Sequence, residues 1–319
     1  MSQPGRACPL HYRYSPSVFA TPAEAACDVL YVVGGVYGNE FALQRVLELF
    51  DAERGDKRLV FNGDFNWFDI DAASFQRLNE TVLAFDATRG NVETELMADS
   101  GEMGCGCAYP DWVGDEVVHY SNTIMAVLQQ TARAQPALAQ RLARLPMWRR
   151  IDVAGRRVAI VHGDAVSLSG WGFAQESLSQ PAHRAQVEDW LRQARVDIFA
   201  SSHTCLPVFE RLASGIVLNN GAAGMPNFAG TQYGLFTRIA TTPAPAAVRC
   251  FGFEHGGLFL DALELEFDAS AWQQTFVAQW PPGSAGHRSY WRRIVEGPSY
   301  RVRDALRPPP TSDTISPRS

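Results

Sequence analysis

The sequence has few cysteines and lacks the marks of a membrane-spanning or secreted chain. Its six cysteines in 319 residues show no CxxC spacing, so a disulfide framework is not expected and reduced thiols are predicted. No apolar run approaches the roughly 20 residues that a membrane span requires. The N-terminus has no basic segment followed by an apolar one. We therefore expect a cytoplasmic protein with no membrane partner.

An excess of positive charge is also missing. The formal net charge is −6, which argues against general nucleic-acid binding. Positive charge is concentrated in residues 287–319, which hold seven arginines. We expect 283–319 to form a loose, arginine-rich and flexible tail, with a docking segment for an acidic partner as the alternative. Residues 1–28 are predicted to form an irregular N-terminal arm.

Between these ends the chain contains enough apolar residues, 46% of the sequence, to fill the core of a large α/β domain at 29–282, with an insert at about 100–135. Apolar runs rich in β-formers alternate with segments of helical period, the pattern of a layered α/β fold. Strands are predicted at 28–35, 57–64, near 84–91, in a hairpin over 148–164 and at 196–204, and helices at 39–53, 71–85 and 119–145. From 206 to 268 the period is closer to two, which predicts a mostly antiparallel second sheet.

Polar residues of metal-binding type stand at the ends of successive predicted strands. Asp64 follows "LVFNG", Asn91 follows "DATRG", His162 follows "VAIV" and His203 follows "DIFASS". Ligands of open α/β sheets bind at the carboxyl edge, so these side chains can meet at one point. Together they offer two oxygens and two nitrogens with one negative charge, a set that suits Zn²⁺, Mn²⁺, Fe²⁺ or Co²⁺. The alternative is that each residue caps a helix or closes a hydrogen-bonded turn.

Five short motifs occur in a fixed order: "GVYGN" (35–39), "GD" (63–64), "GNVE" (90–93), "HGD" (162–164) and "SHTCLP" (202–207). In this order the chain resembles the calcineurin-like metallophosphoesterases, whose pattern is DxHGN, GD, GNH[DE], H and GHTHxP. The resemblance covers about residues 29–240. It implies an α/β sandwich of two mixed sheets flanked by helices, and metal-dependent hydrolysis of phosphoesters.

The departures from this pattern concern one of the two metal positions of the family. The resemblance implies that the second metal keeps Asp64, Asn91, His162 and His203. The first metal loses most of its ligands, because the family's Asp and His of DxH are Gly35 and Tyr37 here, and the last His of GHTH is Cys205. We therefore expect one ion, with two as the alternative and Cys205 as a further candidate ligand. The histidine that assists the leaving group in the family is Val92, so the general acid is unassigned.

Further candidates surround this set. Asn39, Tyr37 and Gly163 are predicted to help place the phosphate, and a packing role is the alternative for Tyr37. Cys105 and Cys107 could rebuild a softer first site or form only a tight glycine turn. His119 is either a surface residue or a substitute acid. Aromatic residues near the site form a cleft wall for an organic group or simply pack in the core: Phe65, Trp67, Phe68, Trp112, Trp171 and Phe173.

The sequence thus predicts a phosphoesterase, either a phosphomonoesterase or a phosphodiesterase, with one intact metal position, weakened or altered catalysis and a small phosphorylated substrate. The alternative is a catalytically inactive protein that uses the same fold for binding or as a scaffold. Oligomeric state is left open.

Overall fold

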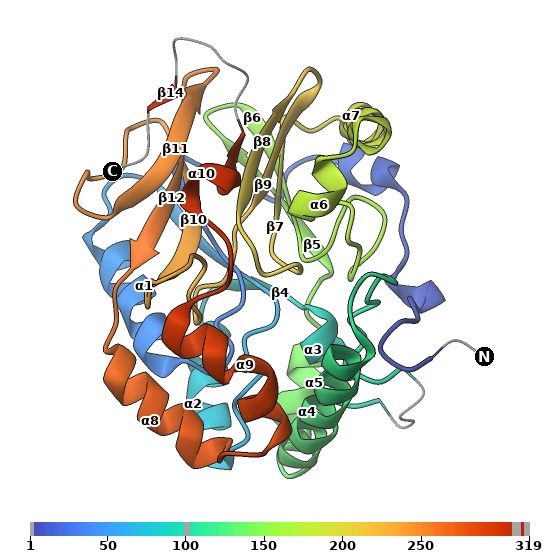
Figure 1. Cartoon of the computed structure of the whole chain (residues 1–319). Helices are drawn as coiled ribbons and strands as arrows, with labels where there is room; N and C mark the ends of the chain where they lie inside the picture. Colours follow the sequence, from blue (N-terminus) through green and yellow to red (C-terminus); the bar gives the residue numbers. More distant parts are fainter. Residues whose placement is uncertain (1–2, 99–102, 308–313, 316–319) are drawn as a thin grey trace.

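Two mixed β-sheets lie face to face, and helices cover their outer surfaces (Figure 1). The computed structural model describes residues 3–98, 103–307 and 314–315. Each sheet has seven strands. This arrangement confirms the α/β sandwich of two mixed sheets that the sequence motifs imply.

The first sheet has the order β14-β11-β12-β10-β2-β3-β4. Its parallel part is β2, β3 and β4, and its remaining strands pair antiparallel. The strands are β2 (Val29–Val33), β3 (Lys57–Asn62), β4 (Asp86–Thr88), β10 (Gly234–Ala240), β11 (Arg249–His255), β12 (Leu258–Leu265) and β14 (Thr314–Ile315).

The second sheet has the order β1-β5-β6-β7-β9-β8-β13. Its centre is the parallel set β6, β7 and β9. The strands are β1 (Ala25–Cys27), β5 (Trp148–Val153), β6 (Arg156–Val161), β7 (Ile198–Ser201), β8 (Val208–Leu212), β9 (Gly215–Asn219) and β13 (Leu306–Arg307).

Helices connect the strands on both outer faces and at the lower end of the view in Figure 1. The α-helices are α1 (Glu40–Ala52), α2 (Ala72–Val82), α3 (Asn91–Glu95), α4 (Asp115–Arg133), α5 (Pro136–Ala143), α6 (Gln175–Leu178), α7 (Pro181–Ala194), α8 (Ala269–Gln279), α9 (Ala285–Glu296) and α10 (Val302–Ala305). Two 3₁₀ turns, η1 (Leu10–Tyr12) and η2 (Pro16–Ala20), lie in the N-terminal arm.

Alternation along the strands builds the core between the sheets. On β2, Leu30 and Val32 belong to the cluster between the two sheets, whereas Tyr31 and Val33 belong to the cluster under the helices. The opposite sheet contributes Ile160 to the central cluster. Because successive side chains of a strand point to opposite faces, one fully buried strand joins both layers. The strand ends that carry the polar residues are held by this packing.

Two sequence predictions about the strands and the C-terminal region are wrong. Strands 206–268 do not form a sheet of their own: β9 pairs parallel with β7, and β10 pairs antiparallel with β2. A period of two identifies a strand but not its partner. The predicted loose tail is ordered over 285–307 as α9, α10 and β13, because α9 packs against α4. The remainder of that tail lies outside the described residues, apart from β14.

No helix within the described ranges is both long enough and apolar enough to cross a membrane.

Asp69 is a carboxylic acid buried near the start of α2. Its side chain is 0% exposed, and neither oxygen has a hydrogen-bond partner of normal geometry among the described residues. Burial is the main cause that raises the pKa of Asp69 to about 7, with Ser74 lowering it and the Glu40 and Asp71 carboxylates adding to the rise. An unfolded aspartate has a pKa of about 3.9. The folded state therefore holds the proton more tightly, and stability is lost as the pH rises from about 4 through about 7.

We predict that Asp69→Asn gains stability relative to the wild type as the pH rises. The amide carries no charge, so its burial does not become costlier at high pH. The gain in the free energy of unfolding, relative to the wild type, is expected to be about 3 kcal/mol between pH 5 and pH 8. Denaturant unfolding at both pH values measures it. The matched control is Asp71→Asn, at an exposed N-cap where asparagine caps equally well. The prediction is contradicted if the difference in the free energy of unfolding between Asp69→Asn and the wild type is the same at both pH values.

Candidate metal centre

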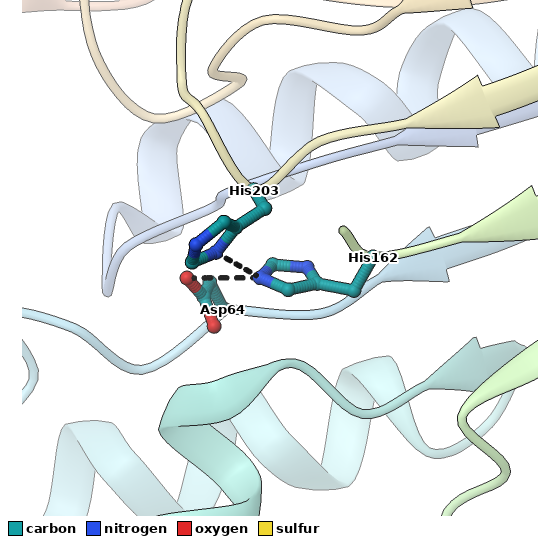
Figure 2. A group of neighbouring side chains, drawn as sticks. All are labelled: Asp64, His162 and His203. Atoms are coloured by element: carbon teal, nitrogen blue, oxygen red, sulfur yellow. Dashed lines mark hydrogen bonds and ion pairs between the residues drawn. The ribbon is translucent and has the colours of Figure 1, made fainter. Parts of the chain in front are cut away.

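The four polar residues at strand ends meet at the common carboxyl edge of the two sheets. Asp64 follows β3 and Asn91 begins α3 after β4, both in the first sheet. His162 follows β6 and His203 follows β7 in the second sheet. Figure 2 shows Asp64, His162 and His203 pointing toward one another from separate strands. In the described part of the chain, these three form the one group of acidic, histidine and cysteine side chains whose ligand atoms all lie within 4.8 Å of one another.

His162 Nε2 is the central atom of this group. It lies 3.3 Å from Asp64 Oδ2, 3.2 Å from Asn91 Oδ1 and 3.2 Å from His203 Nδ1. Neighbouring ligands of a tetrahedral shell with metal bonds of roughly 2.0 Å lie about 3.3 Å apart. The spacing of the donor atoms therefore matches that of a transition-metal shell.

Backbone carbonyls turn the histidine hydrogens away from the centre. His162 Nδ1 lies 2.9 Å from the carbonyl oxygen of Asn62, and His203 Nε2 lies 2.9 Å from that of Cys107. A carbonyl oxygen can only accept, so each of these nitrogens donates. The lone pairs of His162 Nε2 and His203 Nδ1 then face the centre, the orientation that metal-bound histidines need.

Hydrogen bonds also fix the two oxygen donors. Asp64 Oδ1 accepts from the backbone N–H of Val92 at 3.1 Å, which leaves Oδ2 facing His162. Asn91 Nδ2 donates to the carbonyl of Cys105 at 2.9 Å, so its Oδ1 points into the centre. All four donor atoms thus present lone pairs to one buried point. Lone pairs repel one another there unless a proton or a metal ion lies between them, and a divalent cation fits this set.

The titration behaviour of the site agrees with a preference for positive charge. Burial opposes ionisation, but the His162 and His203 rings outweigh it and lower the pKa of Asp64. Burial likewise opposes a charged His162, but Asp64 outweighs it and raises the pKa of His162. Burial and the neighbouring His162 lower the pKa of His203 to about 4, so His203 is neutral near pH 7. The site has one carboxylate and at least one neutral imidazole to offer a cation.

Strained backbone marks the site. Tyr37, Asp64 and Cys205 have φ values of 55°, 55° and 60°, in the left-handed region that non-glycine residues seldom occupy. Such residues cluster at functional sites, where the surrounding structure holds them. Glu93 supplies part of that support for Asp64. Its carboxylate accepts from the backbone N–H groups of Asp64, Phe65 and Gly90, and burial and Asp64 raise the pKa of Glu93 to about 7.

Tyr37 and Cys205 contact each other beside the four donors. The Tyr37 hydroxyl lies 2.8 Å from Cys205 Sγ. Burial raises the pKa of both groups, so both keep their protons at neutral pH in this structure. A Cβ atom on Gly35 would lie 2.2–2.4 Å from the Tyr37 ring. The ring therefore occupies the space that a side chain at position 35 would need.

Cys105 and Cys107 are joined in a disulfide, so the prediction of reduced thiols is wrong for this pair. Neither sulfur is available as a thiolate ligand in this state. The loop acts through its backbone instead, because the Cys105 carbonyl orients Asn91 and the Cys107 carbonyl orients His203. The prediction of an inert glycine turn therefore misses a positioning role that does not depend on the side chains.

A cavity of about 300 Å³ opens over the metal centre. Its floor includes Asp64, Asn91 and His203. The walls are largely apolar or aromatic, with a few polar groups: Tyr37, Trp67, Val92, Cys107, Tyr109, Val113, Val117, Trp171, Thr204, Cys205, Ser289, Tyr290 and Arg293. Its size and lining are those of a small-molecule site.

The aromatic residues predicted from the sequence divide between this wall and the core. Trp67 and Trp171 line the cavity, and Trp112 is exposed beside Trp171, with ring centroids 6.5 Å apart. Phe65, Phe68 and Phe173 belong to the hydrophobic core instead. For these three phenylalanines the packing alternative is correct.

Three other candidates lie away from the cavity wall. Asn39 is fully buried, caps α1 by accepting from the Ala42 N–H, and donates to the carbonyl of Gly224. Gly163 is buried against the 167–170 turn. Their roles toward phosphate stay predictions without a contact to the cavity. His119 is exposed on α4 and is not among the lining residues, which favours the surface interpretation.

Sequence reasoning missed several residues that the fold brings to the site. Glu93 had a signal, because it belongs to the "GNVE" motif two positions after Asn91. Tyr290 and Arg293 had none, because they lie in the segment predicted as a tail. Tyr109 is equally without a motif. Only the docking of α9 beside the 103–109 loop places these residues on one cavity.

Comparison with known proteins identifies the fold. No protein-family model matches the sequence, and no curated protein matches it. Solved structures match the chain. It is similar to a hypothetical protein from Pyrococcus horikoshii, with a TM-score of 0.57 and 13% sequence identity. This match covers 86% of this chain and 100% of that one. It is also similar to a metallophosphoesterase from Sphaerobacter thermophilus, with a TM-score of 0.51 and 17% identity over 82% of this chain and 98% of that one. The chain has the metallophosphoesterase fold.

We predict that the purified protein binds one equivalent of Zn²⁺ or Mn²⁺. His162→Ala is expected to lower the affinity by more than about 100-fold, because loss of an outer-shell partner alone typically costs roughly 10–100-fold and this change removes the central donor. Titration calorimetry and metal analysis after dialysis measure both quantities.

The matched controls are Tyr37→Phe and Cys205→Ala, which change groups next to the four donors. Each is expected to leave one ion per chain with an affinity near that of the wild type. If the wild type binds a second equivalent of metal and either control loses it, Tyr37 or Cys205 is a ligand and the prediction is wrong.

Proposed function

We propose that the protein is a metal-dependent phosphoesterase that holds one divalent transition-metal ion and hydrolyses a small phosphorylated molecule. Asp64, Asn91, His162 and His203 would bind the ion, with Zn²⁺, Mn²⁺, Fe²⁺ and Co²⁺ as candidates. The observation that carries the proposal is the convergence of four oriented lone pairs, three of which belong to residues that line one cavity. The metallophosphoesterase fold supports it.

A single ion is proposed because the groups beside it are neutral. Tyr37 and Cys205 hydrogen-bond to each other rather than turning toward a second cation. The Tyr37 ring also excludes a side chain at position 35. When bound, the ion would polarise a phosphoryl oxygen and lower the pKa of a coordinated water.

The chain's own residues would hold and enclose the substrate. The cavity of about 300 Å³ has room for a phosphoryl group with a small organic substituent. Trp67, Tyr109, Trp171 and Tyr290 offer flat apolar surfaces to that substituent. We therefore propose a phosphomonoester or phosphodiester with a small aromatic or apolar alcohol.

Proton transfer to the leaving group has candidate donors in the same walls. Val92 cannot serve, but Tyr37, Tyr109 and Tyr290 are among the lining residues and each carries a hydroxyl. Burial raises the pKa of all three, so each keeps its proton at neutral pH. A tyrosine of raised pKa is a weak acid, which fits the proposal of slow or altered catalysis.

A catalytically inactive binding protein or scaffold is the second candidate. The neutral Tyr37–Cys205 pair favours it, because the partner ion that would help activate the nucleophile is not provided for. Metal-dependent turnover separates the two candidates directly.

We predict that the metal-loaded protein hydrolyses p-nitrophenyl phosphate or bis-p-nitrophenyl phosphate. Asp64→Ala and His203→Ala are each expected to lower kcat/KM at least about 100-fold, because the ion supplies several kcal/mol of transition-state stabilisation. Release of p-nitrophenol with added Mn²⁺ or Zn²⁺ measures the rate.

The control is His119→Ala, a histidine exposed on α4 outside the cavity. Its kcat/KM is expected to stay within about twofold of the wild type. Bound metal without any turnover in the wild type would favour the binding or scaffold function.

A further inference from the structure

Arg293 brings a positive charge to the cavity beside the Tyr37–Cys205 pair. It lies in the last turn of α9 and lines the cavity that has the metal centre on its floor. Its Nη2 donates to the carbonyl of Cys205 at 2.8 Å, and its Nε donates to the carbonyl of Pro226 at 3.2 Å. Two hydrogen bonds therefore fix the plane of the guanidinium against the loop that carries Cys205.

This charge has no acidic partner in the described ranges of the chain. No carboxylate of those residues lies within ion-pair distance of Arg293, whereas its neighbour Arg292 pairs with Glu296 at 2.9 Å. Nη1 makes no hydrogen bond to a described residue. An arginine that is fixed by carbonyls and keeps its outer N–H groups unused is prepared to bind an anion.

The charge balance of the cavity points to a phosphate. Asp64 is the one acidic residue among those that line it. A divalent ion, one carboxylate and the Arg293 guanidinium together leave an excess of about two positive charges. A phosphomonoester carries close to two negative charges at neutral pH. The low-dielectric aromatic walls strengthen this attraction.

The charge of Arg293 acts at the position where the resemblance places the first metal of the family. Its Nη2 donates to the Cys205 carbonyl, and the Cys205 Sγ lies 2.8 Å from the Tyr37 hydroxyl, so the guanidinium is fixed beside both residues. These two residues correspond to lost ligands of that metal. Arg293 is therefore the cation that faces the metal centre from the side of the missing ion.

We propose that Arg293 binds the substrate phosphoryl group and takes the place of the first metal as a source of positive charge. The role of Arg293 in catalysis rests on the proposed function. Its binding of phosphate does not. The guanidinium donates from Nη1 to a phosphoryl oxygen, and no bond of the arginine itself is made or broken. The exposed end of α9 thereby becomes part of the site.

Binding of inorganic phosphate tests the proposal apart from turnover. Titration calorimetry on the metal-free and the Zn²⁺-loaded protein compares wild type, Arg293→Ala, Arg293→Lys and the control Arg292→Ala. We expect Arg293→Ala to weaken phosphate binding in both forms by about 10- to 100-fold, because hydrogen bonds to charged groups contribute roughly 1.5–3 kcal/mol. Arg293→Lys should recover part of that affinity, and Arg292→Ala should stay within about twofold.

Zn²⁺ affinity and kinetics separate binding from a structural role. Arg293→Ala is expected to leave Zn²⁺ affinity unchanged, to raise KM about tenfold and to lower kcat for p-nitrophenyl phosphate. A parallel loss of Zn²⁺ and phosphate affinity that lysine does not rescue overturns the proposal, because Arg293 would then only support the Cys205 loop. Equal phosphate affinity in Arg293→Ala and Arg292→Ala overturns it too.

Two further outcomes keep the inference and the proposed function distinct. If Arg293→Ala does not fold, Arg293→Gln replaces it as a neutral variant of similar size, and Arg293→Lys must bind phosphate more tightly than Arg293→Gln.

Phosphate binding that depends on Arg293 without any hydrolysis supports the inference and refutes the esterase function. Hydrolysis that depends on Asp64 but not on Arg293 supports the esterase function and refutes the inference.

Discussion

The mutual repulsion of four buried lone pairs is the constraint on which the site depends. The carbonyls of Asn62 and Cys107 accept hydrogen bonds from His162 Nδ1 and His203 Nε2, so the facing nitrogens of the neutral rings present lone pairs. Hydrogen bonds turn the oxygens of Asp64 and Asn91 to the same point. Such an arrangement is unfavourable by itself and favourable around a cation. The fold supplies the packing that holds it.

Groups that offer no ligand atom do much of this positioning. Asp64 keeps an unfavourable positive φ because Glu93 accepts from the N–H groups around it. The Cys105–Cys107 turn contributes two carbonyls that orient Asn91 and His203. Residues that bind no ion themselves therefore decide where the ligand atoms point. Their own chemistry gives little indication of this role.

Tyr37, Cys205 and Arg293 form one connected group beside the four donors. The Tyr37 ring uses the space above Gly35, its hydroxyl meets Cys205, and Arg293 is anchored to the Cys205 carbonyl. These changes are physically coupled, since a larger residue at 35 collides with the ring. Two hydrogen-bonded side chains and one guanidinium therefore lie together next to the candidate metal ligands. The walls of the same cavity are largely apolar or aromatic.

The sequence determined the strands that carry the candidate site and the order of the polar residues at their ends, because local periodicity and glycine-bounded motifs are properties of short segments. It therefore predicted Asp64, Asn91, His162 and His203 as one set. It did not determine which sheet β9 and β10 join, that α9 is packed rather than loose, or that Arg293 and Tyr290 reach the cavity. Those facts depend on contacts between segments far apart in the chain. Only tertiary packing decides such contacts, since no local pattern encodes a partner.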